Sequence, residues 1–175
     1  DVAILSGTNT MAFGAVGAGA QVSFGSGADM ATFTGAIGAA SIYGGDGADT
    51  LDFNAAVGAA TIDAGTGVDS LNFSGAVTGA TVSGLDTAGD IAILSGQNTM
   101  AFGAVGTGAQ VSFGSGADMA TFTGAIGAAS IYGGDGADTL DFNAAVGAAT
   151  IDAGTGVDSL NFSGAVTGAT VSGLD

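Results

Sequence analysis

Lys, Arg, His, Glu, Cys, Pro and Trp are all absent from this sequence. Without Lys or Arg to meet phosphates, the chain is not expected to bind nucleic acid. Without His, Cys, Lys, Arg or Glu, it offers no conventional nucleophile and base pair and no zinc ligand set, so we do not expect an enzyme. The absence of Cys leaves the redox compartment open, because a secreted protein can be stabilised by metal ions in place of disulfides.

Charge of only one sign is present, because 16 Asp residues produce a net charge of −16. Hydrophobic residues make up 47% of the chain, yet they are mostly Ala and are interrupted every few residues by Gly, Ser, Thr or Asn. No transmembrane insertion is therefore expected. Phe, Ile, Val and Leu recur at regular spacing, which indicates a packed core. The chain starts at Asp1 without a charged, hydrophobic leader, so any targeting signal is expected outside this stretch.

Two long repeats account for the whole chain. Residues 1–86 match residues 90–175 at 83 of 86 positions, and the three differences are Val2/Ile91, Thr8/Gln97 and Ala18/Thr107. The repeat unit is 89 residues long, so the units are 1–89 and a shorter 90–175. We expect one continuous solenoid that belongs to a longer array, because repeats of this kind stack on their neighbours.

A shorter period of 20 residues runs inside each unit and is marked by Phe13, Phe33, Phe53 and Phe73. Each period has two unlike halves, one with Gly-x-Gly-x-Asp before a short strand and one rich in Ala. Residues alternate between inward and outward positions within these strands, as in Leu-Asp-Phe at 51–53. Strands of about four residues must stack on neighbours, and 35 Gly residues argue against helices. The pattern predicts an all-β, parallel β-roll (β-solenoid) with two-sided coils of about 20 residues.

An extra half coil at 85–93 raises the number of strands per unit to nine. In a two-sided roll, an odd number of half coils moves the acidic turns to the opposite edge in the second unit. The alternative is a three-sided β-helix with coils of about 30 residues, in which the acidic turns would stay on the same edge in both units. Two unlike half coils alternate with a period of 20 residues, and this alternation favours the two-sided roll. The acidic edge would then run through Asp29, Asp49, Asp69 and Asp90 and cross over for Asp118, Asp138 and Asp158.

Stacked carboxylates need a counter-ion in a chain without Lys or Arg. At a coil spacing of about 4.8 Å, two unit charges repel by about 1 kcal/mol in water and by several times more near a protein surface. Carboxylate and carbonyl oxygens at a flexible turn suit Ca²⁺. Asp after Gly is also a common solvated turn former, but six such turns in register favour calcium.

The segments GGDGADTLD at 44–52 and 133–141 resemble the GGxGxDxUx nonapeptide of the RTX (repeats-in-toxin) family, where U is a large apolar residue. The resemblance implies a parallel β-roll in which turn carbonyls and the sixth-position Asp bind Ca²⁺ shared with the next coil. It assigns the main ligands to Asp49 and Asp138. It adds carbonyls near Gly45, Gly47, Gly134 and Gly136, the side chains of Asp46 and Asp135, and, from weaker matches, Asp29, Asp69, Asp118 and Asp158.

Some turns depart from this motif. Phe24 and Ala64 replace its first Gly, and Asn9 and Asn98 stand where the family has Asp. Calcium is expected to bind weakly or not at all at the Asn turns. The Ala-rich half turns carry no acidic residue, so calcium should line one edge only within a unit.

Nearly identical units and open strand ladders point to a structural array that associates with itself, end to end or laterally. The resemblance extends to RTX-type surface fibril and S-layer proteins of bacteria. It implies a secreted, extracellular component of the cell surface in which calcium switches folding on outside the cell. The alternatives are an RTX adhesin or extender and an ice- or carbohydrate-binding module with surface polysaccharide as a partner. The turn column Ser6, Ser26, Asp46 and Thr66 is too irregular for an ice lattice.

Overall fold

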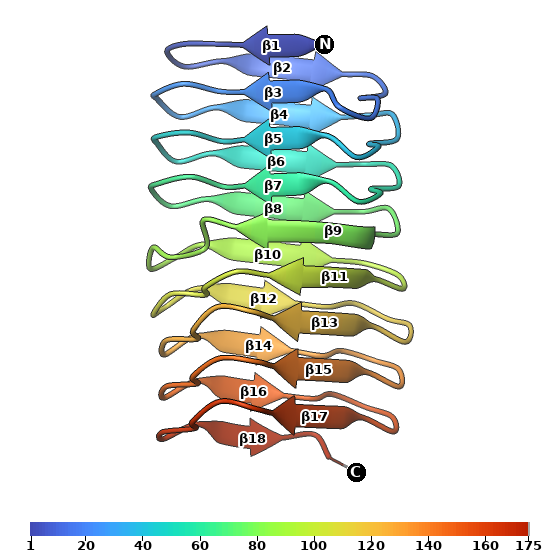
Figure 1. The fold of residues 1–175 in the computed structure, drawn as a ribbon, viewed down its shortest axis with the longest axis vertical. Coiled ribbons are helices and arrows are strands. Elements are labelled where there is room, and N and C mark those ends of the chain that lie inside the picture. Colours follow the sequence, from blue (N-terminus) through green and yellow to red (C-terminus); the bar gives the residue numbers. More distant parts are fainter. Residues whose placement is uncertain (175) are drawn as a thin grey trace.

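Successive strands lie in alternate sheets along the whole chain, so the molecule is a two-sided parallel β-solenoid (Figure 1). The computed structural model describes residues 1–174, and within this range it contains two sheets of nine strands and no helix. Every strand pairing is parallel, with coils of about 20 residues. The predicted two-sided β-roll is therefore confirmed. The three-sided alternative is wrong, because it requires a third sheet.

The odd-numbered strands form one sheet, called here the odd sheet, and the even-numbered strands form the even sheet. The odd sheet contains β1 (Val2–Ile4), β3 (Gln21–Ser23), β5 (Ser41–Tyr43), β7 (Thr61–Asp63), β9 (Thr78–Ser83), β11 (Thr99–Phe102), β13 (Met119–Phe122), β15 (Thr139–Phe142) and β17 (Ser159–Phe162). The even sheet contains β2 (Thr10–Phe13), β4 (Met30–Phe33), β6 (Thr50–Phe53), β8 (Ser70–Phe73), β10 (Ile91–Leu94), β12 (Gln110–Ser112), β14 (Ser130–Tyr132), β16 (Thr150–Asp152) and β18 (Thr170–Ser172).

Phenylalanine side chains form the centre of the core. Phe33, Phe53 and Phe73 are fully buried, and their rings stack with centroids 4.9 Å and then 4.7 Å apart. This spacing equals the distance between neighbouring strands, so register and ring stacking reinforce each other. Ile42 and Ile62 close the core from the opposite sheet. The prediction that the Phe column is core is confirmed. Each buried ring contributes about 1.5–3 kcal/mol relative to exposure.

The Gly-x-Gly turns stack so closely that only glycine fits. Gly47 has a φ of +135°, and a Cβ on it would collide with the backbone carbonyl of Gly27 in the preceding coil. The turns are held together by backbone hydrogen bonds, such as the Asp46 N–H donating to the Gly25 carbonyl at 2.9 Å. The glycine spacing in the sequence is thus a direct consequence of coil stacking.

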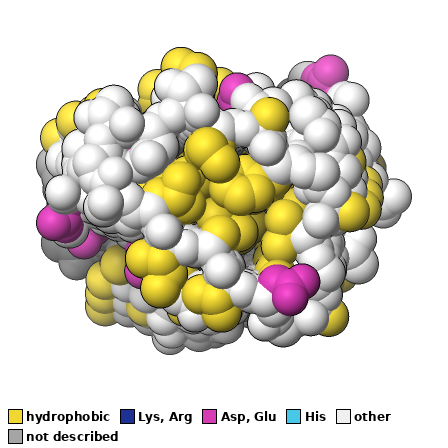
Figure 2. Space-filling view, turned by 90° about the horizontal axis from the view of Figure 1, so that it is seen from above, with side chains coloured by type: hydrophobic (Ala, Val, Ile, Leu, Met, Phe, Trp, Pro, Cys, Tyr) yellow, Lys and Arg dark blue, Asp and Glu magenta, His cyan; other side chains and the backbone are white. Residues whose placement is uncertain are grey.

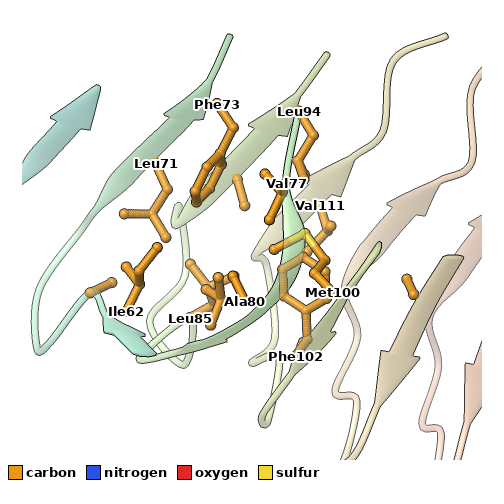
Figure 3. Packing of buried hydrophobic residues seen from close by; sticks show 14 of the residues in the cluster. Ile62, Leu71, Phe73, Val77, Ala80, Leu85, Leu94, Met100, Phe102 and Val111 are labelled. Carbon is orange, nitrogen blue, oxygen red and sulfur yellow. The ribbon is translucent and has the colours of Figure 1, made fainter. Parts of the chain in front are cut away.

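The two repeat units meet between β8–β9 and β10–β11. β10 pairs with β8 in the even sheet, and β11 pairs with β9 in the odd sheet with a register shift at Thr99/Met100. Leu85, Met100 and Phe102 fill the space between the sheets at this junction (Figure 3). Because each unit contributes nine strands, equivalent strands of the two units lie in opposite sheets. The predicted exchange of edges is confirmed.

No helix long and apolar enough to cross a membrane occurs among residues 1–174.

Candidate metal site along the aspartate edges

Two columns of buried aspartates follow the turns, one on each edge of the solenoid. The first ladder is Asn9, Asp29, Asp49, Asp69 and Asp90, and the second ladder is Asn98, Asp118, Asp138 and Asp158. Asp29, Asp49 and Asp69 are each 2% exposed, and Asp90 is fully buried. Aspartate is almost never buried to this extent without a partner of opposite charge.

One carboxylate oxygen of each ladder aspartate joins neighbouring coils. Asp49 Oδ1 accepts the Asp29 N–H at 2.8 Å, Asp69 Oδ1 accepts the Asp49 N–H at 2.8 Å, and Asp90 Oδ1 accepts the Asp69 N–H at 2.9 Å. The same pattern links Asp118 to Asp138. The ladder therefore fixes the stacking of turns with hydrogen bonds to a charged acceptor, which are about twice as strong as neutral ones.

Asparagine begins each ladder. The Asn9 backbone N–H and side-chain Nδ2 both donate to Asp29 Oδ1, at 2.6 and 2.7 Å. Asn98 makes the same pair of bonds to Asp118 Oδ1, at 2.6 and 2.9 Å. The amide supplies a donor where an aspartate would add a further charge. Asn9 and Asn98, which depart from the calcium-binding motif in the sequence, are thus caps that complete the hydrogen bonding of each ladder.

The other carboxylate oxygen, Oδ2, is buried without any hydrogen-bond partner at six ladder positions within residues 1–174. These positions are Asp29, Asp49, Asp69, Asp118, Asp138 and Asp158. An unsatisfied buried polar group costs about 1–3 kcal/mol, and a charged one costs more. Asp90 differs, because its Oδ2 accepts the Thr87 N–H at 2.7 Å. Asp90 therefore belongs to the ladder as predicted, but both of its oxygens already have partners.

The first glycine of the RTX-like motif allows a backbone carbonyl of the next coil to approach the turn beside the unpaired carboxylate oxygen. A Cβ built on Gly44 would lie 3.0 Å from Asp49 Oδ2 and would collide with the carbonyl oxygen of Ala64 in the next coil. In the second unit, a Cβ on Gly133 would lie 3.1 Å from Asp138 Oδ2 and would collide with the Ala153 carbonyl. A carbonyl oxygen and an unpaired carboxylate oxygen from successive coils thus approach the same side of one glycine, where no side chain would fit. Carboxylate and carbonyl oxygens are the donors that suit Ca²⁺.

The coil before Gly44 is built differently. Phe24 occupies the position that Gly44 holds, and its ring is buried against Phe13 with centroids 6.0 Å apart. The two complete motifs are therefore the places where a ladder carboxylate and a carbonyl oxygen approach the same glycine. The Ala64 and Ala153 carbonyls were not identified from the sequence motif. The 20-residue period, which aligns Ala64 with Gly44, is the signal that could have found them.

The remaining predicted ligands lie farther out in the turn. Asp46 is exposed, and its Oδ1 accepts the Thr66 hydroxyl at 2.9 Å, while Asp135 Oδ1 accepts the Thr155 hydroxyl at 2.8 Å. Among residues 1–174, no three acidic side chains come close enough to hold a metal ion by themselves. Backbone carbonyls would have to complete any site. Two of the predicted ones, Gly45 and Gly134, already accept the Thr66 and Thr155 N–H groups, at 2.8 Å each, but keep a second lone pair.

Burial changes the acidity of the ladder. Desolvation raises the pKa of Asp69 to about 6, and repulsion from Asp49 and Asp90 contributes in the same direction. Desolvation is also the main cause that raises the pKa values of Asp49, Asp118 and Asp138. Burial therefore disfavours the ionised form of these four carboxyl groups, and a cation beside them would offset that cost.

No family model, no curated protein and no solved structure matches this chain. The resemblance to RTX repeats therefore remains a prediction.

Proposed function

We propose that the chain is a calcium-stabilised structural repeat of a secreted bacterial surface filament or S-layer. The observation that supports this proposal most strongly is the set of six buried Asp Oδ2 atoms without a partner. The chain has no Lys or Arg with which to neutralise them. A bound cation would remove the repulsion along each ladder and supply the missing interaction.

Calcium would be held first at the two complete motifs. Asp49 Oδ2 and the Ala64 carbonyl would bind it beside Gly44, and Asp138 Oδ2 and the Ala153 carbonyl would bind it beside Gly133. Each pair of ligands comes from two successive coils, so the ion would tie the coils together. The remaining orphan oxygens at Asp29, Asp69, Asp118 and Asp158, with turn carbonyls such as those of Gly47 and Gly136, would hold further ions.

The way in which the molecule distributes its stability supports a structural role. Each coil contacts only the coils before and after it, so stability grows with the number of coils and the length of the array. The outward-facing positions of the strands carry small polar residues such as Ser41, Thr61 and Thr81, and the buried carboxylates point into the turns. In low-calcium cytoplasm the ladders would oppose folding, and in calcium-rich surroundings they would favour it.

Circular dichroism during a calcium titration tests the proposal. The β-sheet signal of the 175-residue chain should increase cooperatively with Ca²⁺, and in EDTA at neutral pH a smaller folded fraction of lower stability should remain. In the double variant Asp49→Asn and Asp138→Asn, the calcium midpoint should rise about tenfold or more, since each lost charged ligand costs about 1.5–3 kcal/mol.

The matched control is Asp46→Asn with Asp135→Asn, which removes the same two charges from exposed positions in the same turns. Its midpoint should move much less. A β-sheet signal that is identical in EDTA and in calcium would rule out the proposal.

A further inference from the structure

The two ladders leave a stretch of the solenoid between them that differs from both. In the first ladder the last unpaired Oδ2 belongs to Asp69, and in the second ladder the first one belongs to Asp118. Residues 70–117 lie between them, form β8 to β12 and include the extra half coil. We call these residues the junction segment, and we call residues 29–69 and 118–158 the ladder segments. Each ladder segment contains three unpaired Oδ2 atoms, whereas within the junction segment every buried side-chain nitrogen and oxygen has a hydrogen-bond partner.

Asp90 is the buried carboxylate of the junction segment, and the extra half coil supplies its second donor. Its Oδ1 accepts a backbone N–H of the preceding coil at 2.9 Å, and its Oδ2 accepts the Thr87 N–H at 2.7 Å. Thr87 stands three residues before Asp90, as Asp46 stands three residues before Asp49 in the RTX-like motif. The Asp46 N–H instead donates to the Gly25 carbonyl at 2.9 Å. The half coil thus gives Asp90 a donor within its own turn that the ladder aspartates lack.

Asn98, at the other edge of the junction segment, also satisfies its side chain without a cation. It is 1% exposed. Its Oδ1 accepts the Val77 N–H at 3.2 Å, and its Nδ2 donates to the Gly96 carbonyl at 2.8 Å and to Asp118 Oδ1 at 2.9 Å. Because each polar atom of this side chain has a partner, no ligand is needed here to offset a desolvation penalty.

Apolar packing is continuous through the junction segment. Leu85, Met100 and Phe102 are buried and fill the space between the two sheets (Figure 3). Seen along the axis of the solenoid, apolar side chains occupy the centre and acidic side chains lie at the rim (Figure 2). The core of the junction segment is therefore held together by contacts that do not involve an ion.

We propose that the junction segment is a metal-independent part of the solenoid, whose strands stay paired when calcium is removed while the ladder segments open. Opening can be confined in this way because each coil of a solenoid contacts only its neighbours. The role of calcium in this switch rests on the proposed function. The difference between the segments rests on the satisfied groups of Asp90 and Asn98.

The retained strands would also preserve the register of the array. Coils that repeat every 20 residues present similar side chains after a slip by one coil, so the ladder segments alone specify their pairing weakly. The half coil at 85–93 occurs only once in the sequence and has no such alternative. When calcium returns, β6 would pair again with β8, and β13 would pair again with β11. Folding would then propagate from strands that are already in place.

Hydrogen exchange measured by mass spectrometry at neutral pH tests the inference. A peptide of residues 85–97 reports on the junction segment, because its sequence occurs only once. The peptide GGDGADTLDF occurs at 44–53 and at 133–142, so it reports the mean of the two ladder segments. In EDTA, the hydrogen-bonded amides of residues 85–97 should exchange at least about tenfold more slowly than those of the ladder peptide. Calcium should slow exchange of the ladder peptide at least about tenfold and that of the junction peptide much less.

A pair of variants separates the effect of the unpaired carboxylates from that of position, because central coils open less easily than terminal coils in any solenoid. Asp49→Asn with Asp138→Asn keeps the Oδ1 acceptors and removes two of the unpaired charges. In EDTA, exchange of its ladder peptide should slow about threefold or more, which reduces the difference from the junction peptide. The control, Asp46→Asn with Asp135→Asn, removes two charges at exposed positions and should leave the difference unchanged.

The outcomes distinguish this inference from the proposed function. If both peptides lose protection together in EDTA while calcium protects the ladder peptide, the inference is wrong and the proposed function stands. The inference is also wrong if the difference between the peptides is the same in the Asp49 and Asp138 variant as in the unchanged chain, because position alone then protects the junction segment. A ladder peptide that exchanges equally fast in calcium and in EDTA refutes the proposed function, and the calcium switch is refuted with it.

Discussion

Within one repeat unit, the acidic edge and the alanine-rich edge achieve the same coil spacing by different means. On the alanine-rich edge of the first unit, Val16, Ile37 and Val57 are buried and linked by parallel bridges. On the acidic edge, the equivalent stacking depends on carboxylates that accept backbone N–H groups and leave Oδ2 unpaired. The first kind of edge is stable without any ligand. The second kind buries carboxylates in a chain without Lys or Arg, and we propose that a cation neutralises them.

Because the acidic turns change edges between the two units, each edge of the solenoid is acidic along only part of its length. The first ladder ends at Asp90, and the second begins at Asn98 on the other edge. Under the proposed function, each edge would therefore bind calcium over only part of its length. The extra half coil at 85–93 is the feature that creates this alternation.

The largest expected effect on stability comes from Gly→Ala substitutions, which should act differently on the acidic edge and on the alanine-rich edge. Gly44→Ala would place a methyl group between Asp49 Oδ2 and the Ala64 carbonyl and should destabilise the calcium-loaded chain by at least about 2 kcal/mol. Gly58→Ala lies on the alanine-rich edge, where the Cβ would stand 3.3 Å from the Ile37 carbonyl, and should change stability by less than about 1 kcal/mol. Urea unfolding in calcium measures both. Equal effects at the two glycines would remove the distinction between the edges.

A second, intermediate effect is the pH dependence of the metal-free chain. The pKa of Asp69 is raised from 3.8 to about 6, so its carboxyl group keeps its proton in the folded chain over a range where the unfolded chain has lost it. Stability in EDTA should therefore be greatest below pH 3.8 and should fall as pH rises to about 6, by roughly 2 kcal/mol for this group. The raised pKa values of Asp49, Asp118 and Asp138 act in the same direction.

Calcium should reverse this pH dependence, because the ion binds the ionised carboxylate and competes with the proton. Thermal unfolding between pH 4 and 8, in EDTA and in calcium, makes the comparison. Parallel curves in the two buffers would show that the ladder and the ion are not linked.

The smallest effect concerns the caps. Asn98→Asp removes the Nδ2 donor to Asp118 and adds a buried charge, so it should destabilise the metal-free chain by about 1–3 kcal/mol. In calcium most of this loss should be recovered. Asn9→Asp makes the same change at a less buried ladder end and should have a smaller effect. Chemical denaturation of both variants decides this, and a loss at Asn98 that calcium does not reduce would contradict the role of the ion.

Much of the fold could be predicted from the sequence because the repeats are so regular. The spacing of Phe33, Phe53 and Phe73 predicted the core, and the odd half coil at 85–93 predicted the exchange of edges. Both predictions depend only on periodicity, which a strand ladder with parallel pairing converts directly into position.

Details of the turns could not be predicted in the same way. Spacing alone did not reveal that Asn98 caps a ladder, that Thr87 satisfies Asp90, or that Asp46 points outward to Thr66. These features depend on the direction of individual side chains and backbone groups, which the local φ and ψ angles of each turn determine. The motif also did not identify the Ala64 carbonyl, because a backbone oxygen can come from any residue type.

Calcium anomalous scattering from a crystal of the chain grown in calcium tests the central claim most directly. We expect anomalous peaks within about 2.6 Å of Asp49 Oδ2 on one edge and of Asp138 Oδ2 on the other, with none beside the alanine-rich turns. Ladders without a peak, with protons or water satisfying the Oδ2 atoms, would contradict it.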